Sequence, residues 1–201
     1  MKTQPPSILT RSDGVLDRMK RASDKVEERL DRATAALTAA GVAYAVVGGN
    51  AIAAWVATVD ESAVRMTRDV DVMVRRDQFD RVQSALTDAG FHYRRVAGID
   101  VFLDSPNSKV GDGVHVVFAG EMVRSHEPGP NPDVDQVEDL GGVPYLALLP
   151  LVQIKLTAFR DKDRVHLRDL IGVGLVDEEW IPRLAEPLAS RLKELLDDPN
   201  G

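Results

Sequence analysis

The chain of 201 residues contains no cysteine. This absence excludes a disulfide scaffold, a thiol nucleophile, a cysteine-ligated zinc site and an iron–sulfur cluster. It fits the reducing cytoplasm, which we take as the expected location. The sequence also lacks an apolar run long enough to cross a bilayer, and residues 1–14 lack the apolar block of a signal peptide. We therefore expect no membrane association.

The chain has fewer basic than acidic residues, with 25 Lys and Arg against 32 Asp and Glu, so its net charge is −7. This balance argues against a broad basic surface for duplex DNA, although it says nothing about one basic pocket. Hydrophobic residues make up 44% of the chain, which is enough for a true core.

The apolar patterns predict a mixed fold. Apolar residues at spacings of 4, 7, 4 and 7 predict a long packing helix up to Gly41; they are Val15, Met19, Val26, Leu30 and Leu37. Strands are expected at 42–49 and 67–74 with a helix between them, followed by a helix over 76–90 that Gly90 closes, and three strands over 91–120. A long loop over 125–142, a short strand at 143–148 and several helices complete the chain.

This order predicts an α/β (α+β) fold with a small mixed sheet flanked by helices and a helical C-terminal part. Residues 1–125 would form the α/β core together with the N-terminal helix. Residues 126–201 would form a loop and helices that pack on that core.

The strongest local signal is a pair of aspartates, Asp69 and Asp71, on the strand over 67–74. Strand alternation places both carboxylates on one face, where they repel each other and where a divalent cation would remove the repulsion. The valines at 70, 72 and 74 would face a core. The alternative is a solvated strand face, which the spacing alone leaves open.

Two glycines, Gly48 and Gly49, lie between the first strand and the next helix, with Asn50 near the helix start. Glycines at such a turn let a phosphate approach the backbone and the free N–H groups of the helix. The alternative is a tight turn that needs a positive φ. The spacing matches neither a Walker motif nor a dinucleotide-binding motif.

Together the two signals are more specific. VGGNAIAAWV followed by RMTRDVDVMV resembles the GG…RxTxDxD pattern of AbiEii-type nucleotidyltransferases, relatives of the MNT group and of MenT-type toxins. The stretch LPLVQIKLTAFRDKDRVHLRDL resembles the KLxAxxxR-like segment and the KDxxDL motif of the same family. The resemblance extends from about residue 42 to about residue 175, and it implies a nucleotidyltransferase-like fold.

The resemblance implies a role for each matching residue. Gly48 and Gly49 would hold the triphosphate of a nucleotide, and Asp69 and Asp71 would be the catalytic metal ligands.

Four further residues match the family motifs. Arg65 and Arg68 would contact phosphate, and Lys155 would lie near the nucleotide phosphates. Asp169 matches the acid of the KDxxDL motif and is a further candidate catalytic residue.

One position departs from the family pattern. The fold usually has a third carboxylate on a later strand, where this chain has His115. Histidine can act as a general base near neutral pH or bind some metals, but it is a poor Mg²⁺ ligand. Three possibilities follow for the missing carboxylate: His115 replaces it, Asp100 or Asp104 replaces it, or the enzyme is impaired. The alternative for His115 itself is a half-buried strand residue without a catalytic role.

Lys155 lies among apolar helix residues, so it either extends to solvent or faces phosphate in a cleft, which the surrounding motif favours. The mixed charges from Arg160 to Asp169, including Asp163, predict mostly surface pairs. His166 would point in roughly the same direction as Lys155.

The sequence thus predicts transfer of a nucleoside monophosphate from a nucleoside triphosphate to an acceptor hydroxyl, with Mg²⁺ as cofactor and Mn²⁺ as the second candidate. The acceptor stays open among a protein, a tRNA and a small molecule. The alternatives are an impaired nucleotide-binding module and a toxin–antitoxin component with an antitoxin-like protein partner.

Overall fold

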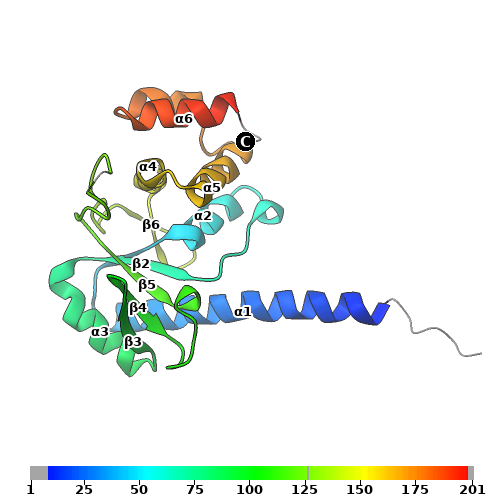
Figure 1. The fold of residues 1–201 in the computed structure, drawn as a ribbon, viewed down its shortest axis with the longest axis vertical. Helices are drawn as coiled ribbons and strands as arrows, with labels where there is room; N and C mark the ends of the chain where they lie inside the picture. Colours follow the sequence, from blue (N-terminus) through cyan, green and yellow to red (C-terminus); the bar gives the residue numbers. More distant parts are fainter. Residues whose placement is uncertain (1–8, 126, 199–201) are drawn as a thin grey trace, which may run out of the picture.

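The computed structural model describes residues 9–125 and 127–198. It has a seven-stranded mixed sheet with helices on both faces, which confirms the predicted fold class (Figure 1). The helices are α1 (Leu9–Ala39), α2 (Gly48–Ala57), α3 (Phe79–Asp88), α4 (Leu148–Ala158), α5 (Asp161–Gly172) and α6 (Leu188–Asp197). The strands are β1 (Tyr44–Val47), β2 (Val70–Val74), β3 (His92–Val96), β4 (Ile99–Leu103), β5 (Val114–Phe118), β6 (Val137–Asp139) and β7 (Pro144–Leu146). Short 3₁₀ turns are η1 (Glu61–Ala63), η2 (Arg76–Gln78), η3 (Val110–Asp112) and η4 (Glu178–Arg183).

The strands lie in the order β3-β4-β5-β2-β1-β7-β6. β2 is antiparallel to β1 and parallel to β5, so it lies near the middle of the sheet. The register pairs Asp71 of β2 directly with His115 of β5. Directly paired residues share a face of the sheet, so the topology brings these two side chains together although they are far apart in the sequence.

Helices cover the two faces unequally. α1 and α3 pack together on one side of the sheet, and α2, α4 and α5 lie on the other side with α6 outermost (Figure 1). The core-facing residues of β2, Val70, Val72 and Val74, are fully buried, as the alternation predicted. Because its inner face is fixed in the core, β2 is a rigid support for the acids on its other face.

Only part of α1 packs as predicted. Leu30 and Leu37 are buried, but Val15 and Met19 are 46% and 52% exposed, so their predicted packing is wrong. The N-terminal part of the helix extends beyond the sheet (Figure 1), and its apolar side chains Val15, Leu16 and Met19 are exposed. In the ranges 9–125 and 127–198, no helix has both the length and the apolar character needed to cross a membrane.

The segment predicted as a loop over 125–142 contains strand β6, whose three residues are all exposed. An exposed edge strand has no apolar alternation, which is why the sequence pattern missed it. The expected short strand is present as β7, and it pairs with β1. Residues after 125 therefore add two strands to the same sheet, and the division into parts at residue 125 stays a prediction.

We expect Leu37→Ala to lower the free energy of unfolding by about 2–5 kcal/mol, because it opens a cavity beneath α1. Leu16→Ala on the same helix is the matched control. Leu16 is 63% exposed, and its truncation should change stability by no more than about 0.5 kcal/mol. Urea denaturation followed by circular dichroism measures both values, and equal effects would contradict the packing described for α1.

Candidate active site

Gly48 forms the junction at which β1 runs directly into α2. Its φ is +68°, and a Cβ added to it would lie 1.9 Å from Asp71 Oδ2. Both the backbone conformation and the lack of space therefore require glycine. Gly49 has no positive φ, but an added Cβ would lie 2.9 Å from Thr67 Oγ1. The glycine pair thus brings the first turn of α2 against Asp71 and Thr67.

Three potential metal ligands converge beside this junction. One ligand atom each of Asp69, Asp71 and His115 lies within 4.8 Å of the others. His115 Nδ1 is 3.4 Å from Asp71 Oδ1 and 3.6 Å from Asp69 Oδ2. The strand predicted from residue 67 begins only at Val70, so Asp69 lies in a bend directly before β2, yet its carboxylate still lies beside that of Asp71. The structure thus brings together the predicted pair of aspartates and His115, the residue that stands where the family pattern has a third carboxylate.

Hydrogen bonds fix the position of Asp69. Thr67 Oγ1 donates to Asp69 Oδ1 at 2.9 Å, and Asn50 Nδ2 donates to the Asp69 carbonyl oxygen at 2.7 Å. Asn50 is the third residue of α2, and Val47 occupies the N-cap position. Thr67 belongs to the RxTxDxD pattern but was not among the predicted site residues. Its short polar side chain, two residues before the first acid, was the signal that the sequence offered.

The local charges change the pKa values of two residues in the cluster. Burial raises the pKa of Asp71, but the interaction with His115 and the charges of Lys155 and Lys162 outweigh burial and hold the pKa below its ordinary value. The Asp71 carboxylate raises the pKa of His115 above 6.5 against the opposing effect of burial. Positive charge beside the two carboxylates is therefore favourable.

A buried ion pair holds Lys155 near the acids. Lys155 is 4% exposed, and its Nζ is 3.3 Å from Oδ1 of the fully buried Asp163. Arg160 Nε donates to the other Asp163 oxygen at 2.6 Å. Burial raises the pKa of Asp163, but Arg160 and Lys155 outweigh it and hold the pKa below its ordinary value. Asp163 was predicted as a surface partner, and this is wrong; mixed-sign patterning along one helix does not reveal packing against a second helix.

These residues line one cavity of about 440 Å³. Its floor holds Gly48, Asp69, Asp71 and His115, while Lys155, Arg160 and Lys162 line it from α4 and α5. The cavity therefore has an acidic pole on the sheet and a basic pole at α4, α5 and the turn between them, and Arg76, Asp100, Glu121 and Glu127 also line it. The sequence analysis had placed Lys162 among the surface charges.

Asp169 and Arg65 lie in a second, smaller pocket of about 70 Å³ behind Gly49. Arg65 Nε donates to Asp169 Oδ1 at 2.7 Å. Asp169 Oδ2 and His166 Nδ1 are buried and have no hydrogen-bond partner within the described part of the chain. Burial, followed by the charge of Lys155, lowers the pKa of His166 to about 4, so this ring is neutral near pH 7. Asp169 thus lies beside the acid cluster but is not one of its members.

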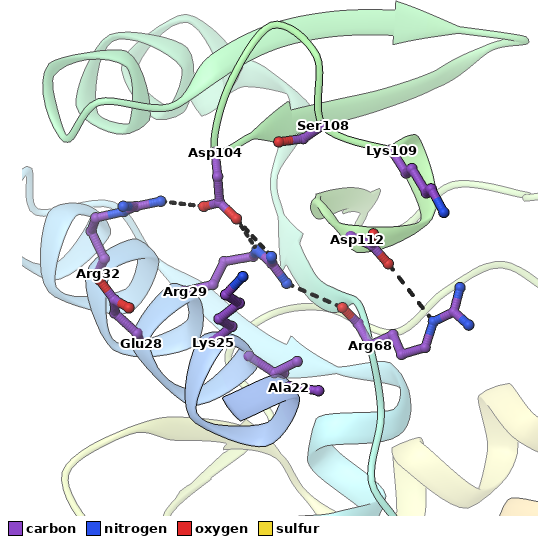
Figure 2. A pocket seen from close by; sticks show the side chains of 11 residues that line it. Ala22, Lys25, Glu28, Arg29, Arg32, Arg68, Asp104, Ser108, Lys109 and Asp112 are labelled. Carbon is purple, nitrogen blue, oxygen red and sulfur yellow. Dashed lines mark hydrogen bonds and ion pairs between the residues drawn. The ribbon is translucent and has the colours of Figure 1, made fainter. Parts of the chain in front are cut away.

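Arg68 and Asp104 line a third pocket, of about 630 Å³, beside α1 (Figure 2). Arg68 Nε is 3.7 Å from Asp112, while Asp104 forms ion pairs with Arg29 and Arg32. The structure therefore places neither Arg68 nor Asp104 in the acid cluster.

Asp100, the other spare acid, is 2% exposed and accepts a hydrogen bond from the Tyr93 hydroxyl at 2.6 Å. It lines the 440 Å³ cavity but is not part of the group of metal-ligand atoms. Of the three candidates for the third-ligand position, His115 is therefore the one beside the aspartate pair.

The donor set of the cluster fits a divalent cation. Two carboxylates and one imidazole nitrogen at this spacing match the ligands that divalent ions use in proteins, and the crowding of like charges calls for a cation.

Comparisons with known proteins agree with this geometry. The chain matches over residues 1–129 the family described as "Uncharacterised nucleotidyltransferase", and it belongs to that family. No curated protein matches.

Two solved structures with similar folds share little sequence identity with the chain. The solution structure of the antibiotic-resistance factor ANT(2'')-Ia has 12% identity and a TM-score of 0.54, covering 87% of this chain and 92% of that one. An antigenic nucleotidyltransferase-like protein from Paracoccidioides brasiliensis has 19% identity and a TM-score of 0.52, covering 88% and 89%. These likenesses support the nucleotidyltransferase fold, and the AbiEii/MNT subtype stays a prediction.

The buried neutral state of His166 predicts a pH-dependent loss of stability. The folded pKa of about 4 lies below the ordinary value of about 6.5, so the unfolded chain binds this proton first as the pH falls through that window. Between pH 7 and pH 5 we expect the native chain to lose about 1–2 kcal/mol more stability than His166→Gln. Urea denaturation at both pH values tests this, and identical losses would refute the neutral assignment.

Proposed function

We propose that the chain transfers a nucleoside monophosphate from a nucleoside triphosphate to an acceptor hydroxyl. In this reaction the hydroxyl oxygen attacks the α-phosphorus, the bond between the α- and β-phosphates breaks, and pyrophosphate leaves with the hydroxyl proton released. Membership of the nucleotidyltransferase family supports the reaction class. The observation that supports it best within the chain is the cavity with one acidic and one basic pole.

The two poles match the two ends of a metal–triphosphate complex. Asp69 and Asp71 would hold the divalent cation, which when bound neutralises phosphate charge and orients the reacting groups. Lys155 and Lys162 are close enough for their charges to lower the pKa of Asp71. Phosphate oxygens that bridge from the cation toward α4 and α5 would therefore meet positive charge, where it stabilises the leaving pyrophosphate.

The junction of β1 and α2 supports a phosphate site beside the cation. At Gly48 a Cβ would collide with Asp71, so glycine allows the backbone to approach whatever the acid pair binds. The first N–H groups of α2 have no partner within the helix and favour an anion. Gly48 and Gly49 would thus hold β- and γ-phosphate oxygens.

The remaining predicted roles have weaker support. Arg65 and Arg68 form ion pairs with Asp169 and Asp112 in the two neighbouring pockets, so their contact with phosphate stays a prediction. The catalytic role of Asp169 stays one too. The acceptor stays open among a protein, a tRNA and a small molecule, and an antitoxin-like partner rests on the family resemblance alone.

The alternative is a nucleotide-binding module without turnover, motivated by the histidine at the third position. The experiment is to incubate the chain with each α-³²P-labelled nucleoside triphosphate, a divalent cation and cell extract. Labelled product together with released pyrophosphate supports transfer. Nucleotide binding by calorimetry without release supports the module instead.

We expect Asp71→Asn to lower the rate of transfer by at least about 10²-fold, because it removes one of the two carboxylates at the acidic pole. Its circular dichroism spectrum should stay native. Asp104→Asn is the matched control, since Asp104 pairs with Arg29 and Arg32 outside the cavity. The rate per folded molecule should be unchanged in this control. A native rate in Asp71→Asn would reject the assignment of the acidic pole.

A further inference from the structure

The orientation of the His115 ring is fixed by a backbone contact. Its Nε2 lies 2.8 Å from the carbonyl oxygen of Val110, the first residue of η3. A carbonyl oxygen can only accept a hydrogen bond, so Nε2 carries a hydrogen and donates it. Nδ1 is therefore the ring nitrogen that faces the two aspartates. A hydrogen bond of this kind from the second ring nitrogen is typical of histidines that bind metals.

The surroundings also fix the distance between the ring and the acids. His115 lies on β5 in register with Asp71 on the neighbouring strand, and its side chain is only 17% exposed. Nδ1 is 3.4 Å from Asp71 Oδ1 and 3.6 Å from Asp69 Oδ2. A cation bound at about 2.0–2.2 Å from each ligand separates adjacent ligand atoms by about 3 Å, so His115 Nδ1 needs only a small movement relative to either acid.

We infer that His115 Nδ1 is a third metal ligand beside Asp69 and Asp71, and that it makes the site prefer Mn²⁺ to Mg²⁺. Imidazole nitrogen is a suitable ligand for first-row transition metals, whereas Mg²⁺ prefers an all-oxygen set. Because the two carboxylates can still bind Mg²⁺, the histidine shifts the preference toward Mn²⁺ without excluding Mg²⁺. The inference rests on the proposed function, since the ion is the one proposed to bind the triphosphate.

The same geometry leaves His115 no free nitrogen for general base catalysis. One nitrogen donates to Val110 and the other is directed at the cation position. His115 thus acts by selecting the ion.

Electron spin echo envelope modulation of Mn²⁺ bound to the full chain, without nucleotide, tests directly whether His115 coordinates the ion. The native chain should show the nitrogen modulation of a directly coordinated imidazole. His115→Asp should bind Mn²⁺ without that modulation, because it supplies oxygen instead. The matched control is His92→Gln, which removes an exposed histidine of β3 and should leave the signal unchanged. Mn²⁺ bound at one site of the native chain without nitrogen modulation would overturn the inference.

Competition between Mn²⁺ and Mg²⁺ in calorimetry tests the preference. We expect His115→Gln to weaken Mn²⁺ binding by about tenfold or more and to weaken Mg²⁺ binding much less. His115→Asp should bind Mg²⁺ more tightly than the native chain does. If the ratio of the two affinities is the same in the native chain and in both variants, the inference fails.

These results do not depend on turnover. Nitrogen modulation with no labelled product would support the ligand role of His115 while rejecting the proposed transferase activity. Labelled product from a native chain whose bound Mn²⁺ shows no nitrogen modulation would support the transferase activity and reject the ligand role of His115. Circular dichroism of each variant establishes that a lost signal is not caused by unfolding.

Discussion

Two carboxylates and an imidazole lie within 4.8 Å of one another at the centre of the sheet, and the neighbouring architecture depends on this crowding. β2 fixes Asp71, and the position of Asp69 directly before it, because Val70, Val72 and Val74 are fully buried in the core. Thr67 and Asn50 then secure Asp69, while His115 and the charge of Lys155 favour the ionised state of Asp71. Without such partners, like charges at this distance would favour protonation of one acid, and the pair could not bind a cation well.

A buried charge also constrains the packing of α4 and α5, because burying the charged Lys155 side chain without a partner of opposite charge would cost free energy. Asp163 compensates its charge from the next helix and is itself fixed by Arg160. A buried ion pair of this kind is weak evidence for stability, since replacement by apolar residues is often neutral. Its more evident consequence is positional, because it holds the Lys155 side chain at the cavity that the two acids also line.

The sequence predicted those parts of the site that depend on local spacing. The Asp-x-Asp spacing predicted a shared face, and Gly48 indicated a turn with positive φ, because each follows from backbone geometry over a few residues. The burial of Asp163 was missed, since it arises from contact between two helices and leaves no periodic signal. Likewise the exposure of Val15 depends on where the sheet ends beneath α1. The sequence placed His115 at the third position, but the orientation of its ring depends on a hydrogen bond to Val110.

The histidine also changes the electrostatics of the whole cavity. Two carboxylates with a neutral imidazole carry two negative charges, which one divalent cation balances. A third carboxylate in place of His115 would leave one negative charge uncompensated, and that charge would repel an approaching triphosphate. With the cluster neutral, a bound triphosphate would meet net positive charge from the helices, because Asp163 compensates only one of the charges of Lys155, Arg160 and Lys162. In the proposed function the acidic pole would then receive the cation and the basic pole the phosphates, and because both poles line one cavity, a ligand in which metal and phosphate are already joined would suit it.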